Sequence, residues 1–244
     1  MPARFFIDTP LVAGTDLDLP PGAARHAQVL RLQPGAEVVL FDGRGGEYAA
    51  TVTKMGRSEV GVRVGTQRAV ERELAPPVTL AIGMPANERM DTLVEKATEL
   101  GAAAIVPLHC ERSVLRLQGE RAHKKQQHWQ GVAIAAAEQS GRTRLPQVHA
   151  VSSLQAWLGI LAPTPGEVRW LLDPGDAMPL AQAMNALAGA AGVVVLSGPE
   201  GGLGAAERAL ALRAGFVAVK LGPRVLRADT APLAVLACLG ACAP

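Results

Sequence analysis

The chain has 244 residues, of which 49% are hydrophobic, and its formal net charge is +2. This much apolar sequence is enough for one large domain or two modest domains with packed cores. Aromatic residues make up only 3% of the chain, which argues against a protein that binds unstructured single strands by stacking on their bases.

The three cysteines have no paired spacing, which argues against a disulfide framework and favours a reducing, cytoplasmic setting. No apolar run approaches the roughly 18 residues that a membrane span requires, and the first residues lack the apolar stretch of a signal peptide. Cys238 and Cys242 lie on an apolar stretch, where buried structural thiols are expected rather than metal ligands. The histidines show no ligand spacing, so we expect neither a membrane span nor a metal site.

Short strand patterns fill the first 72 residues. Alternating apolar runs punctuated by glycine lie at 37–43, 47–55 and 59–67. Such runs are typical of a small barrel or sandwich, and residues 23–32 add one helical pattern. The stretch 68–77 is charged and ends in two prolines, as a linker would be. The predicted organisation is a β domain over 1–72, a linker over 73–77 and a second domain over 78–244.

After Pro77 the pattern changes to buried strands and helices. Nearly continuous apolar runs lie at 78–83, 102–108, 168–173, 192–198 and 216–222. Because helical patterns separate them, these runs predict a parallel sheet covered on both faces, and hence an α/β fold.

The clearest helix is predicted over 87–101. Its apolar side chains fall on one stripe at helical spacing, namely Met90, Leu93, Val94, Ala97 and Leu100. Asn87 suits the N-cap and Gly101 the C-terminal stop. This stripe is expected to be core.

The glycine-rich loop 198–204 follows one of the predicted strands. A phosphate loop would need Gly-Lys-Ser/Thr at the start of the next helix, and this loop has no lysine or serine after its glycines. A dinucleotide fingerprint counted from Gly202 and Gly204 meets Glu207 where it needs a third glycine. Unless the glycines only make a tight turn, the ligand should be uncharged against them or cationic near Glu200.

A second loop repeats this design. Residues 220–240 read as a strand end, a Gly-Pro turn, an irregular segment and an apolar helix, which Asp229 can cap. We expect the strands before the two loops to be neighbours in the parallel sheet. Both loops would then leave its carboxyl edge, where α/β folds bind ligands, and together they could hold a heterocycle and an amino-acid-like tail.

Several motifs in this chain resemble one family. They are "LSGPEGG" (196–202), "LGPRVLR" (221–227), "AAAEQSGRTRLP" (135–146), "RHAQVLRLQPGAEVVLFDGRGGEY" (25–48) and "EKATELGAAAIVPLHCERSV" (95–114). In this order they resemble the 16S ribosomal RNA uridine-N3 methyltransferases of the SPOUT superfamily, and the resemblance covers nearly the whole chain. It implies a SPOUT-type parallel sheet with a C-terminal trefoil knot, preceded by a small PUA-like β-barrel domain that binds RNA.

The resemblance also implies S-adenosylmethionine as the cofactor and a homodimer with the active site at its interface. The residues that would hold the cofactor are Leu172, Leu196, Gly198, Glu200, Gly201, Leu221, Gly222, Val225 and Leu226. The glycines would then admit an adenosine and a methionine moiety rather than phosphates.

One departure from the family falls next to the second loop. Where the family usually has Leu-Arg-Thr-Glu-Thr-Ala, this chain reads "LRADTA", so Asp229 stands in place of glutamate. The shorter side chain favours helix capping over a direct catalytic role.

Methylation at uridine N3 requires removal of a proton at neutral pH. A positive group near the carbonyl oxygens would stabilise the developing anion, and the guanidinium groups of Arg112, Arg142, Arg224 and Arg227 are candidates. We predict Arg142, Arg227 and Asp229 as catalytic, with the base left open between Asp229 and Glu138. For each arginine the alternative is a phosphate contact or a surface ion pair.

Basic residues outnumber acidic ones between Arg112 and Pro146, and such an excess can meet a polyanion. The predicted contacts to the 16S RNA are Arg25, His26, Arg31, Arg112, Arg116, Lys124, Lys125 and Arg224. The alternative for the segment is a solvated helix face. For the protein, the alternatives are a SPOUT methyltransferase for another RNA nucleotide, or an RNA-binding assembly factor without activity.

Overall fold

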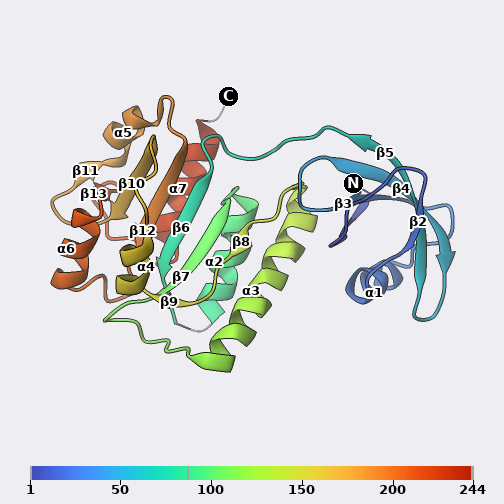
Figure 1. The fold of residues 1–244 in the computed structure, drawn as a ribbon, viewed down its shortest axis with the longest axis horizontal. Coiled ribbons are helices and arrows are strands. Elements are labelled where there is room, and N and C mark those ends of the chain that lie inside the picture. Colours follow the sequence, from blue (N-terminus) through green and yellow to red (C-terminus); the bar gives the residue numbers. More distant parts are fainter. Residues whose placement is uncertain (1, 87, 243–244) are drawn as a thin grey trace. The chain divides into compact units, whose positions relative to one another are not determined.

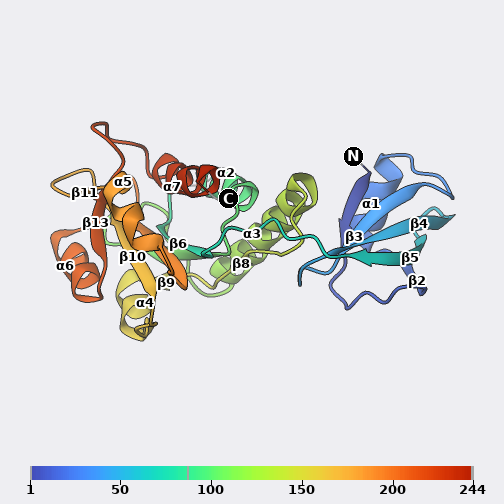
Figure 2. The same ribbon diagram turned by 90° about the horizontal axis from the view of Figure 1, so that it is seen from above.

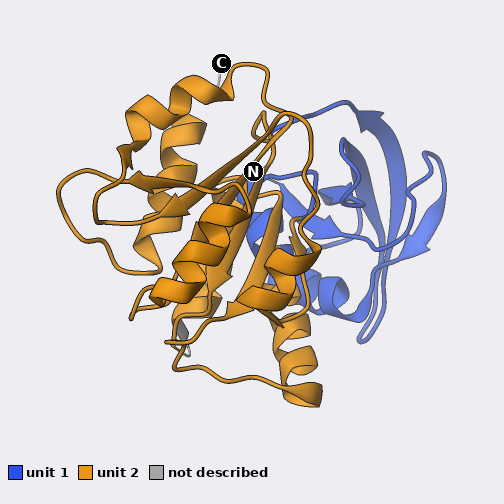
Figure 3. Ribbon diagram, turned by 60° about the vertical axis from the view of Figure 1, so that its left-hand side comes forward, with its two compact units in different colours: residues 1–72, 134–145 blue, residues 73–133, 146–244 orange. Residues whose placement is uncertain are grey.

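The computed structural model describes residues 2–86 and 88–242, so the predicted N-cap Asn87 lies outside the described residues. The chain divides into two compact units (Figure 3). Unit 1 comprises residues 1–72 and 134–145, and unit 2 comprises residues 73–133 and 146–244. The first unit is therefore built from two separate pieces of sequence.

Unit 1 contains a five-stranded mixed sheet in the order β1-β3-β4-β5-β2. Its elements are β1 (Ala3–Phe6), β2 (Asp16–Asp18), α1 (Pro21–Val29), β3 (Glu37–Phe41), β4 (Glu47–Met55) and β5 (Val60–Arg68). The three predicted runs are confirmed as β3, β4 and β5, and the predicted helix as α1. Strands β1 and β2 are too short to show a period, so the sequence pattern predicts neither of them.

A buried ion cluster joins the two pieces of unit 1. The carboxylate of Glu47, only 3% exposed, pairs with Arg4, Arg68 and Arg72. Arg4 also donates to the carbonyl oxygen of Arg142 at 3.0 Å. Burial opposes ionisation of Glu47, but the hydrogen bond from Arg4 and the charges of Arg72 and Arg68 outweigh it and lower its pKa.

Further contacts fix the second piece of unit 1. The backbone N–H of Phe6 donates to Glu138 at 2.9 Å, and Arg72 donates to the carbonyl oxygen of Gly141 at 2.7 Å. Thr143 donates its hydroxyl hydrogen to the carbonyl oxygen of Val70 at 3.1 Å. Residues 134–145 are thus held by both side-chain and backbone groups of residues 1–72.

Unit 2 is an α/β layer structure around a parallel sheet (Figures 1 and 2). Its strands are β6 (Val78–Gly83), β7 (Ala104–His109), β8 (Gln147–Val148), β9 (Ser152–Ser153), β10 (Glu167–Leu172), β11 (Met178–Pro179), β12 (Gly192–Ser197) and β13 (Val217–Lys220). They run in the order β11-β13-β10-β12-β6-β7-β8, with β9 beside β7. The five predicted runs are confirmed as β6, β7, β10, β12 and β13.

The helices of unit 2 cover both faces of this sheet. They are α2 (Glu88–Glu99), α3 (Gly119–Ser140), whose last residues belong to unit 1, α4 (Leu154–Ile160), α5 (Leu180–Ala183) with the 3₁₀ turn Met184–Leu187, α6 (Ala205–Arg213) and α7 (Thr230–Ala241). None of the helices within the described ranges is long and apolar enough to cross a membrane.

Two hydrophobic layers follow from the strand period. Leu80 and Val195 point to the face covered by α2, α3, α5 and α7, whereas Ala81 and Val194 point to the face covered by α4 and α6. Every strand side chain named here is at most 5% exposed, so the predicted sheet with two covered faces is confirmed.

The predicted apolar stripe of α2 is also confirmed as core. Met90, Leu93, Val94 and Ala97 are fully buried, and Leu100 packs against the same cluster. The helix ends at Glu99, and Gly101 adopts a φ of +92°, which suits a glycine that terminates a helix.

One topological expectation is wrong. The strands that precede the two glycine loops, β12 and β13, are not neighbours, because β10 pairs with both and lies between them. Sequential order along the chain does not fix the order of parallel strands, since each crossover can skip a position. As a result, the carboxyl end of β10 lies between the ends of the two strands that lead into the glycine loops.

Candidate functional site

A cavity of about 610 Å³ lies at the carboxyl edge of the unit 2 sheet, within the size range of small-molecule sites. It is lined by the ends of β10, β12 and β13 and by both glycine loops. The prediction that both loops leave this edge and share one pocket is therefore confirmed.

The first loop depends on close backbone packing at Gly83, the last residue of β6. A Cβ atom at this position would lie 2.5 Å from Cδ and 2.6 Å from the backbone nitrogen of Pro199. The loop can therefore rest against the end of β6 only because position 83 has no side chain. This contact sets the height of the loop over the sheet edge.

The second loop turns at Gly222, which has a φ of +79°, in the region that side-chain-bearing residues rarely adopt. On either side of it, Leu221 and Val225 line the cavity, and Val225 is 81% exposed. Asp229 occupies the N-cap position of α7, yet its side chain makes no capping hydrogen bond. Asp229 therefore lies at the predicted N-cap position, but the capping hydrogen bond predicted for its side chain is not formed.

Two carboxylates line the cavity, and each is held by partners. Glu200 accepts from the backbone N–H of Ala86 at 3.0 Å and from Arg89 at 3.4 Å. Asp173, which follows β10, accepts from Nε of Arg208 at 2.6 Å. Burial works against ionisation of Asp173, but the hydrogen bonds from Arg208 and from the backbone of Gly175 prevail and lower its pKa.

Three cations line the same cavity without a carboxylate partner in the described part of the chain: Lys220, Arg224 and Arg227. Both arginines are exposed. Unneutralised guanidinium groups at the rim of a cavity can meet an anionic ligand or an anion that develops during a reaction.

Most of the predicted cofactor residues lie together. Those that line the cavity are Leu172, Gly198, Glu200, Gly201, Leu221, Val225 and Leu226. Leu196 does not line it, because this side chain is fully buried in the core beneath α4 and α6. Gly222 shapes the turn between lining residues.

Four charged residues of the cavity are not predicted from the sequence: Arg89, Asp173, Arg208 and Lys220. A signal was present for Asp173, since it directly follows an apolar strand and the carboxyl ends of parallel strands bind ligands. The remaining three lie on segments that read as ordinary helix and strand sequence.

The predicted catalytic residues fall in different units. Arg227 lines the cavity of unit 2. Arg142 belongs to unit 1 and is only 3% exposed, and Glu138 belongs to unit 1 as well. Burial dominates at Glu138 and raises its pKa, against the backbone N–H of Phe6 and the charges of His26 and Arg4.

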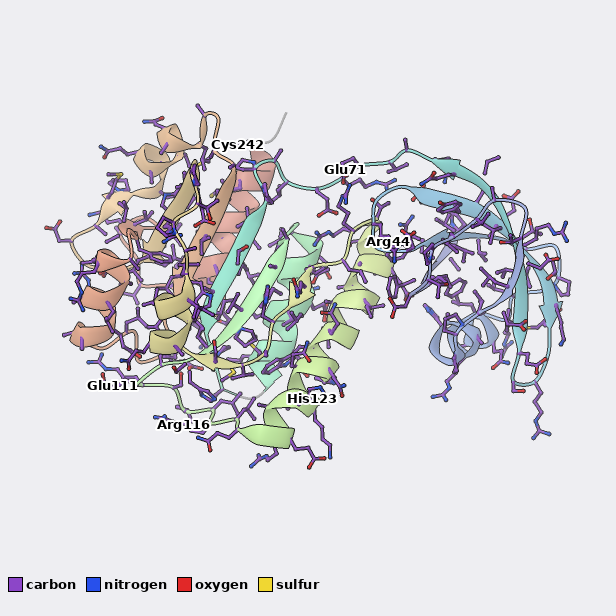
Figure 4. The ribbon with its side chains drawn as sticks, viewed as in Figure 1. Arg44, Glu71, Glu111, Arg116, His123 and Cys242 are labelled. Atoms are coloured by element: carbon purple, nitrogen blue, oxygen red, sulfur yellow. The ribbon has the colours of Figure 1, made fainter. Side chains whose placement is uncertain are left out.

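The predicted RNA contacts in unit 2 lie mainly on the segment after β7. Arg112 donates to the carbonyl oxygen of Gly201 at 2.9 Å, so it braces the first glycine loop. Arg116 donates to the carbonyl oxygen of Glu111 at 3.1 Å, and Figure 4 shows Arg116 and Glu111 on the loop before α3. Lys124 pairs with Glu120 at 2.8 Å, and Lys125 is half-buried.

The predicted RNA contacts in unit 1 lie in and just after α1. Arg25 and Arg31 are exposed. His26 is 48% exposed at its side chain and lies 3.8 Å from Glu138. The basic segment from Arg112 to Arg144 is therefore not one uniform surface, because its last part, with the buried Arg142, belongs to unit 1.

The cysteines differ from expectation. Cys238 and Cys242 are exposed rather than buried, whereas Cys110 is buried. Burial, together with the charge of Glu207, raises the pKa of the Cys110 thiol to about 12. Among the described residues, no group of three His, Cys, Asp or Glu side chains could hold a metal ion.

Known proteins share this sequence and this architecture. An RNA methyltransferase domain family matches residues 72–240, and an RNA methyltransferase PUA domain family matches residues 19–64. Proteins named "Ribosomal RNA small subunit methyltransferase E" from Mycobacterium bovis and Bacillus subtilis are 35% and 31% identical. The alignments cover 96% of this chain and 87% of the first protein, and 86% of this chain and 84% of the second.

Solved structures agree over the full length. The crystal structure of a ribosomal RNA small subunit methyltransferase E from Neisseria gonorrhoeae, bound to S-adenosylmethionine, matches with a TM-score of 0.91 at 32% identity and covers 99% of this chain and 98% of that chain. A methyltransferase from Legionella pneumophila with bound S-adenosylmethionine matches with a TM-score of 0.89 at 29% identity, again covering 99% and 98%.

Proposed function

Because the chain belongs to the ribosomal RNA small subunit methyltransferase E family, we propose that it transfers a methyl group from S-adenosylmethionine to N3 of a uridine in 16S ribosomal RNA. The observation that carries this proposal is the single cavity formed by both glycine loops at the carboxyl edge of the sheet. Relatives of similar length and the same fold bind this cofactor.

The residues of the cavity fit S-adenosylmethionine. Leu172, Leu221 and Leu226 offer an apolar surface for an adenine ring, and the glycine backbones leave room for the rest of the molecule. Glu200 and Asp173 supply carboxylates for its polar and cationic groups. When bound there, the cofactor provides an electrophilic methyl group.

Arg224 and Arg227 are proposed to act on the nucleotide. Uridine N3 becomes a good nucleophile only as its proton leaves, and negative charge then builds on the uracil carbonyl oxygens. A guanidinium group stays charged and donates two hydrogen bonds in one plane, so it stabilises that charge best in the transition state. Arg227 is assigned this role, and Arg224 is assigned to the RNA backbone or the base.

Two further catalytic roles are proposed, for the group that accepts the N3 proton and for the buried Arg142. Asp229 or Glu138 would accept the N3 proton, and the raised pKa of Glu138 suits a general base better than an ordinary carboxyl does. Arg142 is proposed to act through the loop 141–145, since its own side chain is buried and its carbonyl oxygen accepts a hydrogen bond from Arg4.

RNA binding is proposed for both units. The PUA domain match covers α1 and the loop after it, which supports contacts from Arg25, His26 and Arg31. In unit 2 the proposed contacts are Arg112, Arg116, Lys124 and Lys125. Because N3 is a base-pairing position, the target uridine must be unpaired or extruded, at a cost of roughly a few kcal/mol.

We also propose that the C-terminal part of unit 2 is a trefoil knot. After β13 the chain returns past β10 and β12 to place α7 against α2, which is the kind of path that threading requires.

The exposed apolar Val225 at the cavity and the family resemblance support a homodimer that completes the site. The family's substrate supports a cytoplasmic location.

The direct test is transfer of a labelled methyl group to small ribosomal subunits that lack modifications, followed by mapping of the nucleotide. We expect one labelled uridine in 16S RNA, carrying the methyl group at N3. Label at another nucleotide, or on transfer RNA, would show that the enzyme methylates that nucleotide rather than a uridine of 16S RNA. Binding of RNA without any binding of S-adenosylmethionine would indicate an assembly factor instead.

A further inference from the structure

Asp173 follows the strand that lies between the two strands preceding the glycine loops. Strand β10 pairs with β12 on one side and with β13 on the other, so its end lies between the two strands from which the loops leave. Asp173 is the first residue after β10, and it lines the same cavity as both loops. A carboxylate therefore lies on the wall of the cofactor cavity, at the end of the strand between the two loops.

The surrounding residues fix Asp173 in one orientation. Nε of Arg208 donates to Oδ2 at 2.6 Å, and the backbone N–H of Gly175 donates to Oδ1 at 2.9 Å. The Asp173 side chain is 19% exposed. These contacts hold an ionised carboxylate in place at the cavity wall before any ligand arrives.

This carboxylate retains capacity to accept hydrogen bonds. An ionised carboxylate offers about four lone-pair positions on its two oxygens, and the contacts to Arg208 and Gly175 use one on each oxygen. One position on each oxygen is left for a ligand. Two adjacent hydroxyl groups would match this arrangement, as in dinucleotide sites where an acidic residue binds the ribose.

The neighbours of Asp173 favour a ribose over an ammonium group. Arg208 already neutralises the carboxylate, so a second cation would gain less there than a neutral donor pair. Leu172, next to Asp173 in the chain, and Leu221 line the same cavity and offer an apolar surface for adenine, and the ribose is bonded directly to that ring.

We propose that Asp173 accepts hydrogen bonds from the two ribose hydroxyls of S-adenosylmethionine, and that Arg208 is a positioning residue that orients this carboxylate. The inference deepens the proposed function and rests on its cofactor site. It assigns the recognition of the sugar to a residue outside both glycine loops.

Calorimetry with S-adenosylhomocysteine and its 2′,3′-dideoxy analogue tests this assignment. Hydrogen bonds to a charged group are worth a factor of roughly 10 to 150 in affinity. We expect Asp173→Asn to weaken binding of S-adenosylhomocysteine by about tenfold or more, and to leave binding of the dideoxy analogue unchanged. Asp176→Asn is the matched control, because Asp176 is exposed and lies outside the cavity lining.

Arg208 should show the same dependence on the ligand. Arg208→Ala should weaken S-adenosylhomocysteine but not the dideoxy analogue, and Arg208→Lys should restore part of the loss. A purely structural role for Arg208 would weaken both ligands equally. Unchanged binding of the dideoxy analogue also shows that the cavity of each variant is still formed.

Three results would overturn the assignment. The first is an Asp173→Asn variant that binds S-adenosylhomocysteine as tightly as the unchanged protein. The second is a loss that disappears with 5′-methylthioadenosine, which keeps the ribose but lacks the amino acid, because the carboxylate would then bind the ammonium group. The third, no binding of S-adenosylhomocysteine by the unchanged protein, would contradict the proposed function itself.

Discussion

At the scale of single residues, the arginines of this chain divide by whether their charge is already neutralised. Arg4 is buried and paired with Glu47, so its charge serves the fold. Arg224 and Arg227 line the cavity and, within the described ranges, pair with no carboxylate. An unpaired charge at a cavity is available to neutralise an opposite charge on the substrate.

Arg227→Ala should therefore reduce turnover more than binding. Loss of a group that stabilises charge in the transition state costs roughly 10²–10³ in kcat, while the affinity for S-adenosylmethionine should change by less than about threefold because uniform binding is untouched. Single-turnover methyl transfer at saturating RNA gives the rate. Arg213→Ala, at the exposed end of α6, is the matched control, and a change in RNA affinity alone would reassign Arg227 to a phosphate contact.

Glu47→Gln should destabilise unit 1. The substitution leaves the buried Arg4 without its counter-charge, and breaking a buried ion pair in this way costs about 3–5 kcal/mol of unfolding free energy. Denaturant unfolding measures the loss, with the exposed Glu37→Gln as the control. Equal stability of the two variants would show that the cluster contributes nothing.

The same cluster predicts a dependence of stability on pH. The pKa of Glu47 is lowered in the folded chain, so its stabilising contribution is fully present above the ordinary carboxyl pKa of about 4.3. That contribution is lost as the pH falls through the lower, folded pKa. The difference in stability between the unchanged protein and Glu47→Gln should shrink below this range.

At the scale of elements, the height of the first glycine loop depends on the end of β6. Gly83→Ala places a methyl group where backbone atoms of Pro199 and Gly198 lie within 3 Å, so the loop must move. We expect the affinity for S-adenosylmethionine to fall at least about tenfold, since the loop backbone forms one wall of the cavity. Calorimetry on the folded variant measures it.

A matched control exists on the neighbouring strand. A Cβ atom at Gly192 meets only the carbonyl oxygen of Pro77 at an ordinary 3.6 Å. Gly192→Ala should therefore leave cofactor affinity unchanged. Equal cofactor affinities of the two alanine variants would show that the position of the first glycine loop does not affect cofactor binding.

The elements also show what can be predicted from sequence. The strands of unit 2 were predictable because buried parallel strands are nearly continuous apolar runs, and α2 because its stripe has a helical period. The order β13-β10-β12 was not predictable, since it depends on crossovers between distant segments. For this reason the glycine loops were found as candidate walls of the site, and Asp173 between them was missed.

The burial of Arg142 was not predictable either. In the sequence it stands in a basic stretch with glycine and threonine, which favours an exposed loop. In the structure its segment is held by Arg4, Phe6, Val70 and Arg72. Contacts between residues this far apart in the chain leave no local pattern.

At the scale of the whole molecule, the cofactor cavity lies in unit 2 alone, whereas residues 134–145 depend on unit 1. A chain that begins at Glu73 should therefore bind S-adenosylmethionine within about twofold of the full chain, because no lining residue is lost. Residues 134–145 should lose protection from hydrogen exchange, because the groups that hold them are gone. Retained protection of this segment in the shortened chain would contradict its assignment to unit 1.

The two-piece construction of unit 1 also affects the order of events on the ribosome. Its sheet is complete once residue 72 has been made, but the partners of Arg4, Phe6 and Arg72 at residues 138–142 are encoded about 70 residues later. At roughly 5–20 residues per second, the nascent sheet waits about 4–14 s for the acceptor oxygens of Glu138, Gly141 and Arg142. During that interval β6, α2 and β7 are synthesised, so the first strands of unit 2 exist before the N-terminal unit can close. Unit 1 therefore cannot finish folding before part of unit 2 has been made, although it contains the N-terminus of the chain.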